Sequence, residues 1–156
     1  KVGRGTQFRL LSIINLLFYY SLLYNQSINM SDQKKILIIE DDQFLSLILK
    51  GRLEKEGFAV AQAFDGQAGL DALKKEIPDL IILDLIMPRM SGFEFLEVLR
   101  TDPQFGNIPV VAATNLGQES DIQKARSLGV IDYYVKAQTA LDDLVRMLKA
   151  VLEKET

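Results

Sequence analysis

The chain contains no cysteine and no histidine among its 156 residues. The absence of cysteine excludes disulfide bonds and thiolate metal sites. The absence of histidine excludes zinc sites of the usual kind, histidine general bases, and the His–Ser and His–Cys catalytic pairs. Any chemistry that the chain performs must therefore depend on Asp, Glu, Lys, Ser, Thr or Tyr side chains.

Length and composition indicate one soluble globular domain. A chain of 156 residues can bury one proper core but is short for two ordinary domains. Its hydrophobic content of 48% and charged content of 25% are typical of globular proteins. The net charge of −3 divides into +3 over residues 1–29, which contain no acid, and −6 over residues 30–156. Because residues 30–156, the body of the chain, are acidic, we expect no direct binding to nucleic acid.

Residues 1–29 precede what reads as an ordinary protein start at Met30. Their apolar segment, residues 10–24, follows Arg9 and is shorter than the roughly 20 residues needed to span a bilayer. It has no clear small-x-small cleavage site. The favoured interpretation is an N-terminal extension that comes from upstream translation or cloning. A membrane-proximal anchor is the alternative, and a cleaved secretory signal fits least, because residues 30–156 read as a cytoplasmic domain.

From Lys34 onward, short apolar runs alternate with patterns of helical period. We expect strands at residues 36–39, 58–63, 80–83, 110–113 and 132–135, and helices at residues 44–56, 65–76, 91 onward, 119–128 and 139–153. Asp65 and Ser91 are typical N-caps, and Gly57 and Gly129 are suited to ending helices. Five strands alternating with five helices predict an α/β fold with a doubly wound, five-stranded parallel sheet.

Polar side chains follow the strands at what would be one edge of this sheet. A doubly wound sheet binds its ligands at the carboxyl ends of the strands. These ends supply Glu40, Asp41, Asp42, Asp84, Thr114, Asn115 and Lys136. Carboxylates that converge there repel one another unless a cation lies among them. The sequence therefore predicts a hard-cation site in which one carboxylate can act as a nucleophile.

Four motifs stand at the ends of the predicted strands: IEDD at residues 39–42, DLIMP at 84–88 with Gly92, Thr114 after an apolar strand, and YYVK at 133–136. Together they resemble the motifs of the receiver domains of two-component response regulators. They occur in order within residues 34–152, which is the whole body of the chain. The resemblance implies a flavodoxin-like (βα)5 fold in one domain over residues 30–156. It also implies a phosphorelay switch, similar to stand-alone chemotaxis regulators, and not an enzyme with an external substrate.

The resemblance also implies roles for individual residues. Asp84 is expected to accept a phosphoryl group from a sensor histidine kinase or phosphotransfer protein, forming an aspartyl phosphate. Mg²⁺ is the implied cofactor, bound by Asp41, Asp84 and the backbone carbonyl of Ile86. Glu40 is expected to act on the metal through water. Lys136 is expected to contact a phosphoryl oxygen as a compact charge.

The implied output begins at Thr114, whose hydroxyl would also contact a phosphoryl oxygen and would move in doing so. Tyr133 would then swing inward. Together these movements change the surface formed by the fourth helix, fifth strand and fifth helix of the body. That face is expected to bind an output protein or to form a homodimer.

The sequence departs from the family pattern after two of these residues. Ala137 follows Lys136 where proline is usual, so the bond between them should be trans. Asn115 follows Thr114 where alanine is frequent. Both departures support an alternative function, a degenerate receiver that acts as a phosphorylation-independent docking module. Taken singly, each site residue also has a structural interpretation, such as a helix cap, a turn residue or a surface lysine.

Two aliphatic residues suggest slow hydrolysis of an aspartyl phosphate. In the family, the positions of Ile86 and Leu116 flank the path of the attacking water. Aliphatic side chains cannot orient that water by hydrogen bonding, so we expect a long-lived phosphoryl group. Ile86 also disfavours a dehalogenase-like phosphatase, which would need a second acid there. A nucleotide-binding enzyme is disfavoured because acidic residues 40–42 would repel a phosphate.

Overall fold

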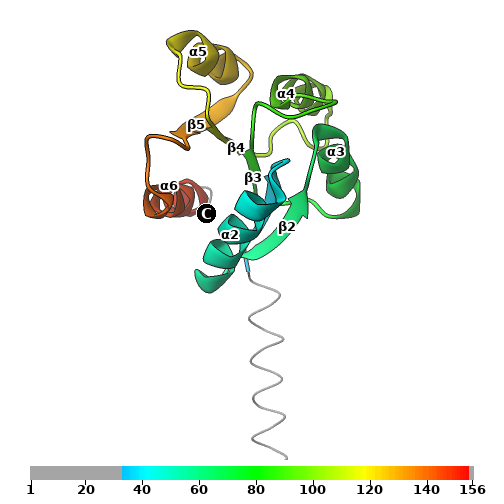
Figure 1. Ribbon diagram of the computed structural model, residues 1–156. Coiled ribbons are helices and arrows are strands. Elements are labelled where there is room, and N and C mark those ends of the chain that lie inside the picture. The colour runs from blue at the N-terminus through cyan, green and yellow to red at the C-terminus, as the bar shows by residue number, and fades with distance from the viewer. Residues whose placement is uncertain (1–32, 155–156) are drawn as a thin grey trace, which may run out of the picture. The chain divides into compact units, whose positions relative to one another are not determined.

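Five strands and five helices alternate along residues 33–154, the part of the chain that this computed structural model describes (Figure 1). In chain order they are β1 (Lys35–Ile39), α2 (Gln43–Lys55), β2 (Ala59–Ala63), α3 (Gly66–Lys75), β3 (Leu80–Leu83), α4 (Gly92–Thr101), β4 (Val110–Thr114), α5 (Glu119–Ser127), β5 (Val130–Val135) and α6 (Leu141–Lys154). All strand pairs are parallel, and the sheet order is β2-β1-β3-β4-β5. The predicted doubly wound parallel sheet is confirmed.

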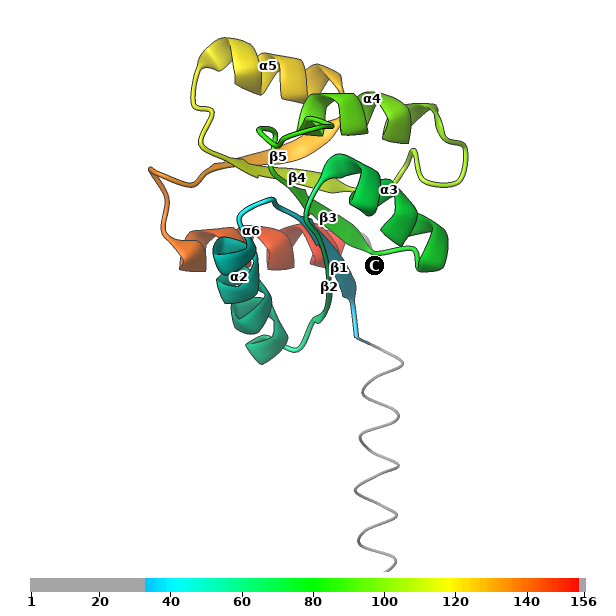
Figure 2. The ribbon, with the colours of Figure 1, turned by 45° about the vertical axis from the view of Figure 1, so that its right-hand side comes forward.

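Helices cover both faces of this sheet. In Figure 2, α3, α4 and α5 lie on one face, and α2 and α6 lie on the other. Successive side chains of a strand point to opposite faces, so Leu37 and Ile39 join one buried cluster, and Ile36 and Ile38 join the other. Burial on both faces is the reason that β3 and residues 36–39 of β1 are apolar throughout.

The fifth strand begins at Val130, two residues before the predicted start at residue 132. Val130 pairs with Val110, but the next pair joins Val111 to Asp132, so a bulge leaves Ile131 out of register. A bulge interrupts the regular alternation of side chains. For that reason the sequence pattern concealed the first two residues of the strand.

The last helix begins later than its predicted start near residue 139. The backbone carbonyl of Thr139 accepts a hydrogen bond from the Tyr134 hydroxyl at 2.7 Å. The first turn of the helix closes on the carbonyl of Ala140, which accepts from the amide of Asp143 at 2.9 Å. Tyr134 and Thr139 are only five residues apart, but the apolar periodicity of the sequence does not show this contact.

The residues from Lys34 onward form one compact unit. The boundary predicted at residue 30 and the interpretation of residues 1–29 lie outside the described residues. Within residues 33–154, every helix is too short or too polar to cross a membrane.

Helix α4 begins in contact with the loop that follows β3. Ser91 and Glu94 form the predicted capping box at its start. The amide of Gly92 donates to the carbonyl of Leu85 at 3.1 Å. A Cβ atom at position 92 would lie 2.3 Å from the Asp84 carbonyl oxygen and 2.6 Å from Leu85 Cα. Only glycine therefore allows the helix to approach the segment that holds Asp84.

We expect Gly92→Ala to destabilise the protein by about 1–3 kcal/mol, because the clashing atoms belong to the backbone and cannot rotate away. Urea unfolding measures this change. Gly117→Ala is the matched control, because its Cβ would meet the side chains of Gln138 and Val135 at ordinary distances of 3.4 and 3.6 Å. Equal losses of stability in the two variants would contradict the close approach.

Glu56 links α2 to α6, because its carboxylate pairs with Arg52 on α2 and with Lys149 on α6. The hydrogen bond from Lys149 and that from Arg52 lower the pKa of Glu56 to about 2. A carboxyl group whose folded pKa is depressed stabilises the fold above its unfolded pKa and loses this effect as the pH falls toward the folded value.

We expect Glu56→Gln to be less stable than the wild type at neutral pH, and the difference to disappear between pH 4.5 and about 2. Thermal unfolding across this pH range measures the difference. Glu97→Gln is the control, because Glu97 is exposed and forms no ion pair within residues 33–154. A Glu56→Gln difference that persists at the acidic end would contradict the assignment.

Candidate functional site

Three carboxylates converge at the carboxyl ends of β1 and β3. Glu40 follows β1 and Asp84 follows β3, and these two strands are neighbours in the sheet. Glu40 is 4% exposed and Asp84 is 7% exposed, whereas Asp41 is open to solvent. Carboxylate oxygens of all three lie within 4.8 Å of one another. The convergence predicted from the strand ends is thus present in the structure.

Lys136 neutralises part of this cluster. It follows β5 and is held there by its own amide, which donates to the carbonyl of Thr114 at 2.9 Å. Its Nζ atom lies 2.5 Å from Glu40 Oε2 and 2.6 Å from Asp84 Oδ2. Burial lowers the pKa of Lys136, but the hydrogen bonds to Asp84 and Glu40 outweigh it, and the pKa is raised overall. The ammonium therefore stays charged between the two buried acids.

Backbone amides orient the remaining carboxylate oxygens. The amide of Ile86 donates to Asp84 Oδ1 at 3.0 Å, and the amide of Asp42 donates to Glu40 Oε1 at 3.3 Å. Burial raises the pKa of Glu40, and the charge of Asp84 adds to this effect, while Lys136 opposes it. Asp42 also caps α2, because its side chain accepts from the amides of Phe44 and Leu45.

The residues of the cluster fit a divalent cation. Three carboxylates and one ammonium sum to a charge of −2 when all are ionised, which a 2+ ion would balance. Oxygen ligands suit Mg²⁺, which binds to few protein groups and keeps several waters. A pocket of about 240 Å³ provides the space, and its lining is Glu40, Asp41, Asp42, Leu45, Asp84, Ile86, Asn115 and Lys136. Leu45 was not among the predicted site residues, since its helical spacing indicated a core position.

A larger depression of about 390 Å³ lies beside β2 and α3. Its only acid is Glu76, which pairs with Lys35. Because it has no convergent carboxylates, its chemistry does not match the predicted cation site.

The predicted switch residues lie next to the pocket and not in its wall. Thr114 ends β4 and is fully buried, with its Oγ1 3.5 Å from the amide of Leu116. The Tyr133 hydroxyl donates to the carbonyl of Leu116 at 3.1 Å. Burial raises the pKa of Tyr133 to about 12, with contributions from the charges of Asp121 and Asp84. Tyr133 therefore remains a neutral hydrogen-bond donor at physiological pH.

The other predicted residues divide between the pocket and the core. Ile86 lines the pocket and is 54% exposed. Leu116 is half-buried against the cluster under α3, α4 and α5. Asn115, the residue that follows Thr114, lines the pocket. Residues 33–154 contain no cis peptide bond, so the bond between Lys136 and Ala137 is trans, as expected.

Curated relatives share most of this domain. The transcriptional regulatory protein CpxR of Escherichia coli is 39% identical over 120 residues, which cover 77% of this chain and 50% of the relative. The phosphate regulon transcriptional regulatory protein PhoB of Rhizobium meliloti is 35% identical over 120 residues, covering 77% of this chain and 52% of the relative. The chain thus spans about half the length of these relatives.

Solved structures share the fold. The chemotaxis protein CheY4 of Vibrio cholerae superposes with a TM-score of 0.71 at 28% identity, covering 76% of this chain and 98% of that chain. The fold is therefore flavodoxin-like, with the five-stranded arrangement of receiver domains. The family model of the response regulator receiver domain matches residues 36–149. The chain therefore belongs to the family of response regulator receiver domains of two-component systems.

Proposed function

We propose that this chain is a phosphorylation-dependent switch that accepts a phosphoryl group on Asp84 with Mg²⁺ bound. The observation that carries the proposal is the cluster of Glu40, Asp41 and Asp84 with Lys136 in contact. Such a cluster combines a nucleophilic carboxylate, a cation seat and a fixed ammonium in one pocket. Phosphoryl transfer needs mainly positioning and charge neutralisation, and these groups supply both.

The proposed donor is a phosphohistidine of a sensor histidine kinase or a phosphotransfer protein. A carboxylate oxygen of Asp84 forms the new bond to phosphorus as the bond from phosphorus to the imidazole nitrogen breaks. The electron pair of that bond stays on the imidazole, which takes up a proton. Asp41, Asp84 and the carbonyl of Ile86 would hold the metal, with Glu40 acting through water. The bound ion would neutralise charge on the phosphoryl oxygens.

Lys136 has a second role in this proposal. In the structure it pairs with Asp84 and Glu40, and it would contact a phosphoryl oxygen once Asp84 is modified. Asp84 loses its carboxylate charge on phosphorylation but gains the charges of the phosphoryl group. The ammonium therefore keeps an anionic partner, and its hydrogen bond to Asp84 would shift from the carboxylate to a phosphoryl oxygen.

The proposed output runs through Thr114 and Tyr133 to the face formed by α5, β5 and α6. Tyr133 lies on β5 and already contacts the loop after β4 through the carbonyl of Leu116. A shift of Thr114 toward the phosphoryl group would change this loop and release the tyrosine. The face would then bind an output protein, or a second copy, in the cytoplasm. The only reactions catalysed would be phosphorylation and dephosphorylation of the chain itself.

A phosphorylation-independent docking module is the second candidate function. It is supported by Asn115, which lines the pocket where alanine is frequent in the family, and by Ala137 after the lysine. The two candidates differ in whether Asp84 is modified.

Intact-mass measurement of the full chain with a small-molecule phosphodonor tests the proposal. We expect one phosphoryl adduct that requires Mg²⁺ and is absent from Asp84→Asn, because the amide is not a nucleophile. Asp71→Asn, at an exposed acid on α3, is the control that should keep the adduct. A wild-type chain that acquires no adduct would instead favour the docking module.

The lifetime of the phosphoryl group tests the prediction made from Ile86 and Leu116. We expect slow loss in the wild type, and about tenfold faster loss in a variant with Ile86→Asn and Leu116→Gln. One added hydrogen bond to the attacking water, of about 1.4 kcal/mol, lowers the barrier by that factor. Val98→Asn on α4 is the control. Rapid wild-type loss that the polar substitutions leave unchanged would overturn the prediction.

A further inference from the structure

Residues 136–140 connect β5 to α6, and we call them the β5–α6 loop; Lys136 is its first residue. The amide of Lys136 donates to the carbonyl of Thr114 at 2.9 Å, which fixes the start of the loop to β4. The amide of Gln138 donates to the carbonyl of Val135 at 3.0 Å and closes a turn. The loop contains no proline, so no ring restricts its backbone angles. Its far end, next to α6, therefore needs another restraint.

Tyr134 supplies this restraint from the core. Its side chain is 6% exposed and belongs to the buried cluster beneath α2 and α6. Its hydroxyl donates to the carbonyl of Thr139 at 2.7 Å. Among the described residues, no other side chain forms a hydrogen bond to the backbone of the β5–α6 loop. Because the ring is buried and has only two side-chain torsion angles, this bond ties the far end of the loop to β5.

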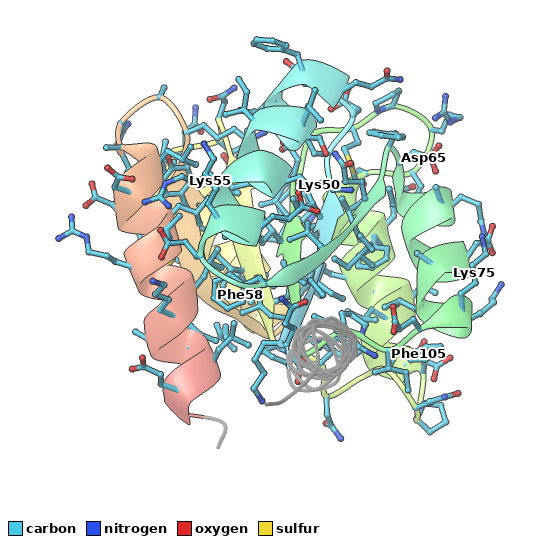
Figure 3. All side chains as sticks on the ribbon, turned by 90° about the horizontal axis from the view of Figure 1, so that it is seen from below. Lys50, Lys55, Phe58, Asp65, Lys75 and Phe105 are labelled. Atoms are coloured by element: carbon cyan, nitrogen blue, oxygen red, sulfur yellow. The ribbon has the colours of Figure 1, made fainter. Side chains whose placement is uncertain are left out.

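A small, mainly apolar cavity lies beside this tyrosine, between α2 and α6. Figures 2 and 3 show the two helices side by side on one face of the sheet, and the ion pair of Arg52 with Asp142 joins them. The cavity has a volume of about 120 Å³, and its lining is Glu40, Leu45, Leu49, Ala113, Tyr134, Lys136, Leu141 and Leu144. Atoms that border empty space lose dispersion contacts on that side. Packing alone therefore does not fix the Lys136 side chain or the start of α6.

The position of Lys136 has to be accurate, because one ammonium serves two acids. Its Nζ atom lies 2.5 Å from Glu40 Oε2 and 2.6 Å from Asp84 Oδ2. A lysine side chain is a flexible four-carbon stem, so its own torsion angles do not hold the ammonium in place. A shift of about 1 Å in the loop would lengthen one of these contacts beyond hydrogen-bond range. The direction in which the stem leaves the backbone therefore depends on the restraint of the loop.

We propose that Tyr134 is a positioning residue for phosphoryl transfer, because its hydroxyl holds the β5–α6 loop and thereby aims the Lys136 ammonium at Asp84. The inference rests on the proposed function, in which Lys136 contacts the phosphoryl group. Tyr134 does not line the carboxylate pocket, so it acts through the lysine and not on the reacting atoms. Its role also differs from that of Tyr133, whose hydroxyl donates to the loop after β4.

The rate of phosphorylation of the full chain by acetyl phosphate, at saturating Mg²⁺, tests the proposal. Tyr134→Phe keeps the ring and removes the hydroxyl, and we expect the rate to fall about tenfold, since small misplacements of a catalytic group are costly. Lys136→Met keeps the stem and removes the ammonium. Adding Tyr134→Phe to Lys136→Met should change the rate less than twofold, because residues that act through one another are not additive.

Mg²⁺ binding, measured by calorimetry without a phosphodonor, separates positioning from general loosening of the site. An ammonium that is less well held neutralises Glu40 and Asp84 less, so the Mg²⁺ dissociation constant of Tyr134→Phe should stay the same or fall. A site that had lost its geometry would bind Mg²⁺ more weakly. This measurement does not need the Lys136→Met variant, so it decides the question even if that variant does not fold.

Thr101→Val is the matched control, because it also removes a hydroxyl that donates to a backbone carbonyl, that of Val98 at 2.8 Å, at the end of α4. It should leave both measurements unchanged. A Tyr134→Phe rate equal to that of the wild type would overturn the inference and leave the proposed function intact. Rate losses that multiply in the double variant, or weaker Mg²⁺ binding by Tyr134→Phe, would also overturn it. A wild type that acquires no phosphoryl group would overturn the proposed function and this inference together.

Discussion

The two ion pairs of Lys136 are the interaction on which the functional end of the molecule depends. Glu40 and Asp84 are both buried and their carboxylates share one small space, so alone they would repel each other. The ammonium reaches them from the far side of β4 and ties the ends of β1 and β3 to the end of β5. Removing one member of such a buried set leaves a charge without its partner. Site geometry and local stability therefore share one cause.

The apolar core makes that arrangement rigid. Residues of β1 and β3 are buried on both faces of the sheet, and their register places the residues after them side by side. The turn after β3 is held from the other side by α4, where Gly92 contacts the backbone of Asp84 and Leu85. The carboxylate of Asp84 is thus positioned by the backbone on one side and by the Lys136 ammonium on the other.

Two surfaces with different physical character extend from this site. The face of α5, β5 and α6 is connected to the pocket through Tyr133 and the loop carrying Leu116. The exposed apolar side chains of α2, Phe44, Leu47 and Ile48, lie near the pocket, since Asp42 caps that helix and Asp41 belongs to the carboxylate cluster. In the proposed switch, the first surface would carry a signal that follows a change inside the pocket. The second is an exposed apolar surface on a single helix.

The sequence alone determined the order of elements, the parallel sheet and the convergence of the acids after β1 and β3, because apolar runs, caps and strand-end residues are local signals. It did not reveal the start of β5, hidden by a bulge at Ile131, or the late start of α6, where Tyr134 takes the carbonyl of Thr139. Lys136 was expected at a phosphoryl oxygen, but only the tertiary structure showed that it already bridges Glu40 and Asp84. Those contacts join residues from distant parts of the chain, and sequence periodicity carries no information about distance across a sheet.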